Sequence, residues 1–172
     1  MKALTKYIKQ LTVAVIALFS VNTASAQYCT ATYSTVCVSG GTNDFVNTFT
    51  TTGGLTDISN VGSGCCLLPD NYIFYAGMPL ISEPGATINF HVESGAIYAQ
   101  GFAIWIDWNS NLVFDAGEKV FASASPGWAA PSVFDGSFVV PAGVECGTYR
   151  MRVRSSYAES GATINPCDNE TF

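Results

Sequence analysis

The order of apolar and polar side chains along the chain predicts strands. Ile88, Phe90 and Val92 alternate with two polar residues, which is the period of a strand with one buried and one solvent-facing side. Residues 102–106 are apolar throughout, as expected for a central strand covered on both faces. The two patterns together indicate a layered β-structure.

Seven such segments occur between turn residues such as Pro84-Gly85 and Pro126-Gly127, and no amphipathic helical window accompanies them. The predicted strands are Phe45–Thr50, Asn71–Tyr75, Thr87–Glu93, Gly101–Trp108, Lys119–Ala124, Ser132–Val140 and Thr148–Ser155. The fold class we predict is all-β, an antiparallel β-sandwich of jelly-roll or Ig-like type with disulfides.

Composition narrows the class of protein further. The chain has 172 residues, of which 48% are hydrophobic and only 12% charged, so we expect one folded domain and neither a disordered chain nor a coiled coil. The formal net charge of -6 leaves little basic surface to neutralise phosphates. We therefore expect no nucleic-acid partner.

Residues 1–26 have the form of a signal peptide. Three lysines precede an apolar run over residues 11–21, and small residues lead to a cleavage site between Ala26 and Gln27. The apolar run is too short to span a bilayer. The sequence thus predicts a secreted or cell-surface protein with one domain over residues 27–172 and no membrane span.

Export favours disulfides among the six cysteines. Cys65 and Cys66 are adjacent in the sequence and are expected to reach different partners. We predict a local bridge between Cys29 and Cys37, with Cys65 and Cys66 joined to Cys146 and Cys167 in an order left open. A zinc site is disfavoured because the chain has no C-x-x-C motif and a single histidine.

An acidic stretch between two predicted strands has the spacing of a calcium loop. Counted from Asp107, oxygen donors fall at positions 1, 3, 5, 9 and 12 of a twelve-residue loop that ends at Glu118. The predicted Ca²⁺ ligands are the side chains of Asp107, Asn109, Asn111, Asp115 and Glu118 and the carbonyl of Val113.

Leu112 occupies the position where such loops place Gly. The alternative is an Asx-rich turn between two strands, since Asp and Asn accept hydrogen bonds from the backbone two residues on. Both interpretations remain open from the sequence.

The chain also resembles the GEVED domain of secreted bacterial proteins over roughly residues 70–172. The residues that carry this resemblance are Trp105-Ile106-Asp107-Trp108-Asn109, Phe114, Gly117-Glu118, Phe138–Pro141, Gly147–Arg152 and Pro166-Cys167. The resemblance implies a non-catalytic β-sandwich module that accompanies peptidase or adhesive domains. The acidic segment that gives the family its name is absent before Phe172, so we expect the chain to be part of a longer protein.

Other residues could carry chemistry. His91 is predicted on the solvent face of its strand, and no G-x-S-x-G or H-E-x-x-H motif occurs, so we expect no enzyme activity. Arg150, Arg152 and Arg154 share one strand face and could bind an anion or pair with nearby acids. Aromatic residues could form a sugar-binding platform or belong to the core; they are Tyr72, Tyr75, Tyr98, Trp108 and Trp128.

The sequence therefore predicts a secreted binding or scaffolding module with a structural calcium loop. Its partners would be adjoining domains of a longer chain, or an extracellular glycan or protein. The alternatives are an accessory domain of a larger extracellular hydrolase, either a peptidase or a glycosidase, and a carbohydrate-binding module.

Overall fold

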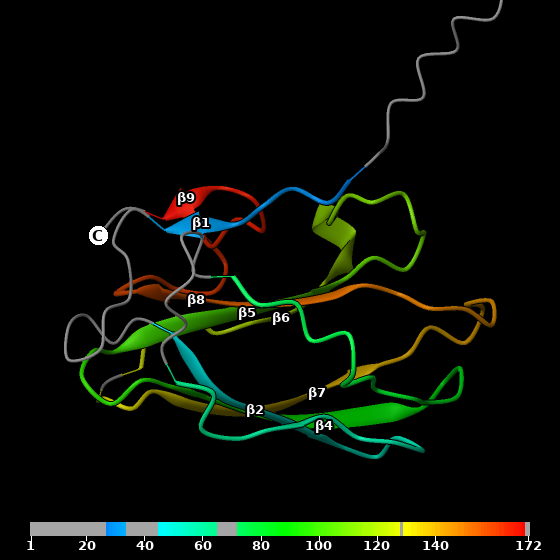
Figure 1. The fold of residues 1–172 in the computed structure, drawn as a ribbon, viewed down its shortest axis with the longest axis horizontal. Coiled ribbons are helices and arrows are strands. Elements are labelled where there is room, and N and C mark those ends of the chain that lie inside the picture. The colour runs from blue at the N-terminus through cyan, green and yellow to red at the C-terminus, as the bar shows by residue number, and fades with distance from the viewer. Residues whose placement is uncertain (1–26, 34–44, 65–71, 128, 171–172) are drawn as a thin grey trace, which may run out of the picture.

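The described residues contain nine strands, which form three layers (Figure 1). The computed structural model describes residues 27–33, 45–64, 72–127 and 129–170. The predicted signal peptide and its cleavage site at Ala26 lie at or beyond the edge of these ranges. None of the helices in the described ranges is long and apolar enough to cross a membrane.

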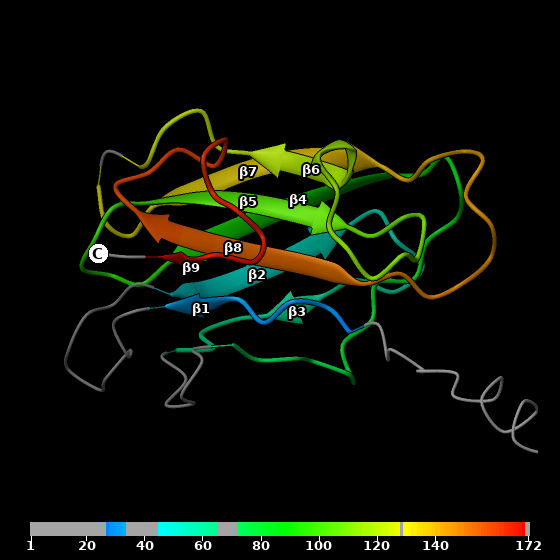
Figure 2. The same ribbon diagram turned by 90° about the horizontal axis from the view of Figure 1, so that it is seen from above.

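Two antiparallel sheets make up the sandwich, and a parallel pair of short strands lies on one of them (Figures 1 and 2). The first sheet has the order β3 (Ser59–Asn60), β2 (Val46–Thr52), β4 (Thr87–Ser94) and β7 (Val133–Val139). The second has the order β6 (Lys119–Ala122), β5 (Gln100–Ile106) and β8 (Met151–Tyr157). The outer pair is β1 (Thr32–Tyr33) with β9 (Asn169–Glu170).

The all-β, sandwich-like fold class is confirmed, and six of the seven predicted strands overlap β2, β4, β5, β6, β7 and β8. The strand predicted over Asn71–Tyr75 is wrong for residues 72–75, which form no ladder, while Asn71 lies outside the described residues. Its run of apolar and aromatic residues has another cause, because these residues pass along the open side of the sandwich.

The main core fills the space between the two sheets. Alternate side chains of β4, namely Ile88, Phe90 and Val92, are buried against those of β5, as the sequence pattern predicts. The ring of Phe90 meets the ring of Phe121 from the opposite sheet edge-on at 4.7 Å.

Every residue of β5 is buried, which confirms the prediction of a strand covered on both faces. One face meets the main core. On the other face Ala103 and Trp105 pack against Phe114, Ile164 and the partly buried Tyr28. The outer layer is therefore needed to exclude water from the middle sheet.

A disulfide joins Cys29 to Cys167 across 138 residues. The predicted Cys29–Cys37 bridge is therefore wrong, as is any bridge from Cys65 or Cys66 to Cys167. The physical reason is that β1 and β9 pair side by side, so the two ends of the described chain meet in space. Cys37, Cys65 and Cys66 lie outside the described residues, and Cys146 is exposed and forms no bridge with a described cysteine.

Two arginines of β8 fix the outer layer to the middle sheet. Arg152 donates to the carbonyls of Cys29 at 2.6 Å and Pro166 at 2.5 Å, and Arg154 donates to the carbonyl of Asn165. Both side chains are buried, and burial lowers the pKa of Arg152. Arg152 also donates to the sulfur of Cys29 at 3.2 Å. These hydrogen bonds go to groups at and beside the disulfide, where the sequence suggested acids or a bound anion.

Replacing Cys29 and Cys167 together by Ser should destabilise the protein by about 2 to 5 kcal/mol, because the bridge closes a very long loop. The melting temperature should fall by at least roughly 4 °C at this chain length. Cys146→Ser is the matched control, since that thiol is exposed and unbridged to any described residue. Equal melting temperatures for the double variant and the control, measured by circular dichroism, would contradict this account.

Candidate functional site

The predicted calcium loop connects β5 to its antiparallel neighbour β6. Asp107 follows the last residue of β5 and is fully buried. Glu118 ends a short 3₁₀ turn, η1 (Ala116–Glu118), and is also buried. The other three side chains are exposed; they belong to Asn109, Asn111 and Asp115.

The carboxylate of Asp107 organises the first half of the loop. It accepts hydrogen bonds from the backbone N–H of Asn111 at 3.2 Å and of Leu112 at 3.0 Å. The hydroxyl of Tyr28 donates to the same carboxylate at 2.5 Å. Three donors therefore compensate the burial of this charge.

Two Asx turns follow. The side-chain oxygen of Asn109 accepts from the N–H of Asn111, and that of Asn111 accepts from the N–H of Val113. Leu112 adopts a left-handed backbone with φ of 68°, so the turn that favours Gly is made here by Leu. Its side chain lines a cleft beside the loop, which gives the larger residue a packing role.

Glu118 closes the loop. Its carboxylate accepts from the N–H of Asn109 at 3.3 Å and of Asp115 at 3.0 Å. The amides of Asn109 and Asn111 both donate to Asp115. The structure thus brings all the predicted side-chain ligands into one hydrogen-bonded loop.

The loop offers carboxylate, carboxamide and carbonyl oxygens, which are the ligands that a hard cation such as Ca²⁺ prefers. Asp107, Asp115 and Glu118 form no ion pair with a described Lys or Arg, and the neighbouring Lys119 donates instead to three carbonyls at residues 161, 162 and 164. Within the described ranges, no three Asp, Glu, His or Cys side chains already converge as a metal group. A calcium sphere here would therefore need the carboxamide and carbonyl oxygens as well as the acids.

Tyr28 connects this loop to the rest of the site. Burial, with the hydrogen bond to Asp107 as the next cause, raises the pKa of Tyr28. The guanidinium of Arg150 lies 4.9 Å from the centre of the Tyr28 ring and 3.8 Å from that of Phe74. An unbroken series of contacts therefore runs from the acidic loop to Phe74.

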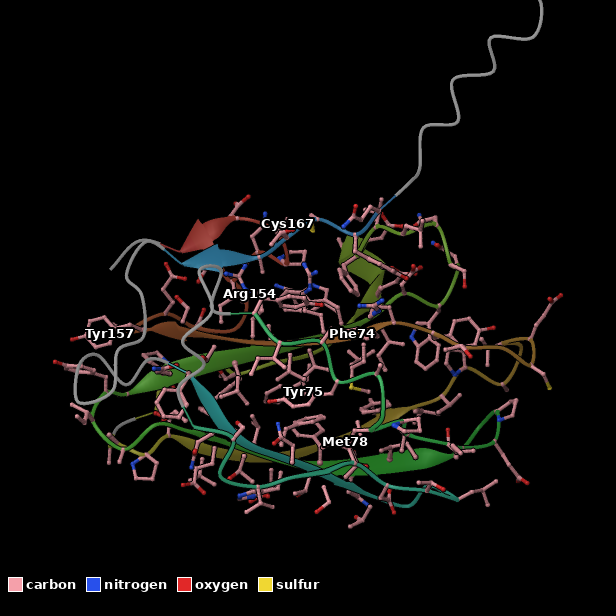
Figure 3. The ribbon with its side chains drawn as sticks, viewed as in Figure 1. Phe74, Tyr75, Met78, Arg154, Tyr157 and Cys167 are labelled. Atoms are coloured by element: carbon pink, nitrogen blue, oxygen red, sulfur yellow. A yellow bond between two sulfur atoms is a disulfide. The ribbon has the colours of Figure 1, made fainter. Side chains whose placement is uncertain are left out.

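Phe74 belongs to residues 72–82, which we call the aromatic strap. The strap passes along the open side of the sandwich, and the side chains of Phe74, Tyr75 and Met78 lie along it (Figure 3). Between it and the two sheets is a cleft of about 990 Å³. The cleft is lined by Phe49, Ile106, Trp108, Leu112, Tyr149, Arg150, Met151 and the strap, among others.

The remaining candidates are placed elsewhere. His91 is partly exposed on β4 and its Nδ1 lies 2.8 Å from the Asp135 carboxylate of β7. Tyr98 packs edge-on against Tyr157, away from the cleft. Of the predicted aromatic platform, Tyr72, Tyr75 and Trp108 line the cleft, and Trp128 lies outside the described residues.

The sequence does not reveal that Tyr28 belongs to the site or that the aromatic strap forms one wall of the cleft. Tyr28 stands beside Cys29, but only the long-range disulfide brings it against Asp107. The apolar and aromatic residues at the start of the strap are visible in the sequence, but they predict a strand over Asn71–Tyr75.

Replacing Tyr28 by Phe should destabilise the protein by about 1 to 2 kcal/mol, because the buried Asp107 carboxylate loses a donor. Tyr149→Phe is the matched control, since its hydroxyl donates at the surface to the Glu145 carbonyl. Urea unfolding would compare the two variants. A loss in Tyr28→Phe no larger than in Tyr149→Phe would contradict the role of Tyr28.

Comparison with known proteins supports one assignment. Residues 101–172 match the family model of the GEVED domain, which confirms the resemblance drawn from the motifs and begins within β5. No curated protein and no solved structure matches the chain.

Proposed function

We propose that this chain with its GEVED domain is an exported, non-catalytic binding and scaffolding module whose β5–β6 loop is a structural calcium site. The observation that carries the proposal is the loop itself. It concentrates three carboxylates without a described cationic partner, and it is joined through Tyr28 and Arg150 to the wall of the cleft.

Asp107, Asp115 and Glu118 would hold the ion through carboxylates, Asn109 and Asn111 through carboxamides, and Val113 through its carbonyl. When bound, Ca²⁺ supplies a positive charge that neutralises the acids and links the two halves of the loop. Leu112 belongs to the same loop and lines the cleft. Fixing the loop thereby fixes one wall of the binding surface.

The conformation of the β5–β6 loop supports its proposed role as a calcium site. Its Asx turns hold the backbone in a turned form, so the chain loses little further entropy when an ion binds. Because the loop joins neighbouring strands of the covered sheet, it stands on a rigid base.

Millimolar calcium should raise the melting temperature of the oxidised protein above its value in EDTA. Free calcium at about a hundred times the dissociation constant adds about 2.7 kcal/mol, which corresponds to roughly 5 to 11 °C at this chain length. Asp115→Asn should reduce the shift, since it removes the charge of an exposed carboxylate that accepts hydrogen bonds from the side-chain amides of Asn109 and Asn111. Its melting temperature in EDTA should stay close to that of the wild type.

Asp135→Asn is the matched control, because Asp135 is an acid on the other sheet, beside His91. It should keep the full calcium shift. The absence of a shift in the wild type, or an equal shift in both variants, would overturn the calcium site.

A further inference from the structure

Arg150 differs from the other two arginines of its strand face in what surrounds it. Arg152 and Arg154 donate to backbone carbonyls. The Arg150 guanidinium lies against the Phe74 and Tyr28 rings, and among the described residues no hydrogen bond or ion pair takes up its N–H groups. The two rings thus hold the partly buried guanidinium of Arg150 in position, and its N–H groups are available to donate to a ligand.

The charges around the cleft are opposite in sign to those of the whole chain. The chain carries a formal charge of -6, yet the charged residues that line the cleft are Arg150, Arg152 and Glu145. Glu145 is exposed, and Arg152 is committed to the carbonyls beside the disulfide. Among the charged groups that line the cleft, Arg150 is therefore the one available to an anion, while the carboxylate of Asp107 lies behind Tyr28.

Most of the rest of the cleft lining is apolar or aromatic. Phe49, Met78, Leu80 and Met151 line it together with Tyr75, and Met side chains adapt to irregular apolar ligands. Its volume of about 990 Å³ lies within the range of small-molecule sites. The polar side chains of the lining include Asn60, Ser63, Ser82 and Thr148, but Arg150 is the cation whose N–H groups no described residue takes up. The lining therefore suits a ligand with one charged end and an apolar body.

We infer that the cleft binds a free amphipathic carboxylate, with its carboxylate at Arg150 and its apolar chain between the aromatic strap and the sheets. This inference rests on the proposed binding function and names its ligand class. Guanidinium and carboxylate form a paired, charge-assisted hydrogen bond, which is stronger in a partly dry cleft than at an open surface.

Three probes with the same apolar chain separate charge from hydrophobicity: dodecanoate, dodecanol and dodecyltrimethylammonium, each below its micelle concentration. Calorimetric titration should show dodecanoate binding about tenfold or more tightly than dodecanol, with the cation weakest. Arg150→Gln should lose this preference while still binding dodecanol, and Arg150→Lys should keep part of it.

Tyr75→Ala should weaken all three probes, because it removes apolar wall from the cleft. Tyr157→Ala is the matched control, since Tyr157 lies at the far end of β8 from Phe74 (Figure 3) and should leave binding unchanged. Melting curves without ligand would verify that each variant folds.

Equal affinity for the three probes, an unchanged preference in Arg150→Gln, or no binding of any probe would overturn the inference. The calcium shift is measured without these probes. Failure of the ligand class therefore leaves the proposed calcium-supported module standing, and failure of the calcium shift leaves the preference for dodecanoate measurable.

Discussion

The hydrogen bonds of Arg152 hold the arrangement of layers together. From β8 its guanidinium reaches the carbonyls of Cys29 and Pro166, which belong to the two segments joined by the disulfide. A guanidinium buried there needs these acceptors, and the carbonyls need a donor because the layer is too short to pair them all within itself. The rings of Tyr72 and Phe114 lie 5.3 and 4.7 Å from the same group.

Placing the outer layer has consequences beyond stability. It covers the second face of β5, so Trp105 is buried, and it brings Tyr28 within hydrogen-bonding distance of Asp107. The acidic loop and the cleft wall therefore depend on the bonds that join Cys29 to Arg152 and Cys167, residues more than a hundred positions away in the sequence. The residues of the loop are close in sequence, whereas the contacts that support the loop join residues far apart in sequence.

This difference explains which features the sequence predicts: local patterns are predictable, and long-range contacts are not. The strands β4 and β5 were predictable from neighbouring residues alone. A strand that is buried on one face has apolar residues at every second position, and a strand that is buried on both faces has an unbroken apolar run. The acidic loop was also predictable from a short stretch of sequence, because the spacing of its oxygen donors is contained within twelve residues. The disulfide partners were not, because the parallel pairing of β1 with β9 leaves no local pattern.

The arginines and the aromatic strap show a second kind of failure. Alternation places Arg150, Arg152 and Arg154 on one face. The carbonyls to which Arg152 and Arg154 donate belong to the backbone, which every residue carries and no sequence motif marks. In the strap, residues 72–75 form a run of apolar and aromatic side chains that predicts a strand, yet they line a cleft and form no ladder. A run of apolar side chains reports burial and does not report hydrogen-bonded pairing.

The disulfide between Cys29 and Cys167 makes the described molecule a covalent ring. Tension applied through residues before Cys29 and after Cys167 passes along the sulfur–sulfur bond and leaves the hydrogen bonds of the two sheets unloaded. A protease that cuts a single exposed loop opens the ring without releasing a fragment, because both products stay attached through the bridge. Such mechanical shielding suits the scaffolding role proposed above.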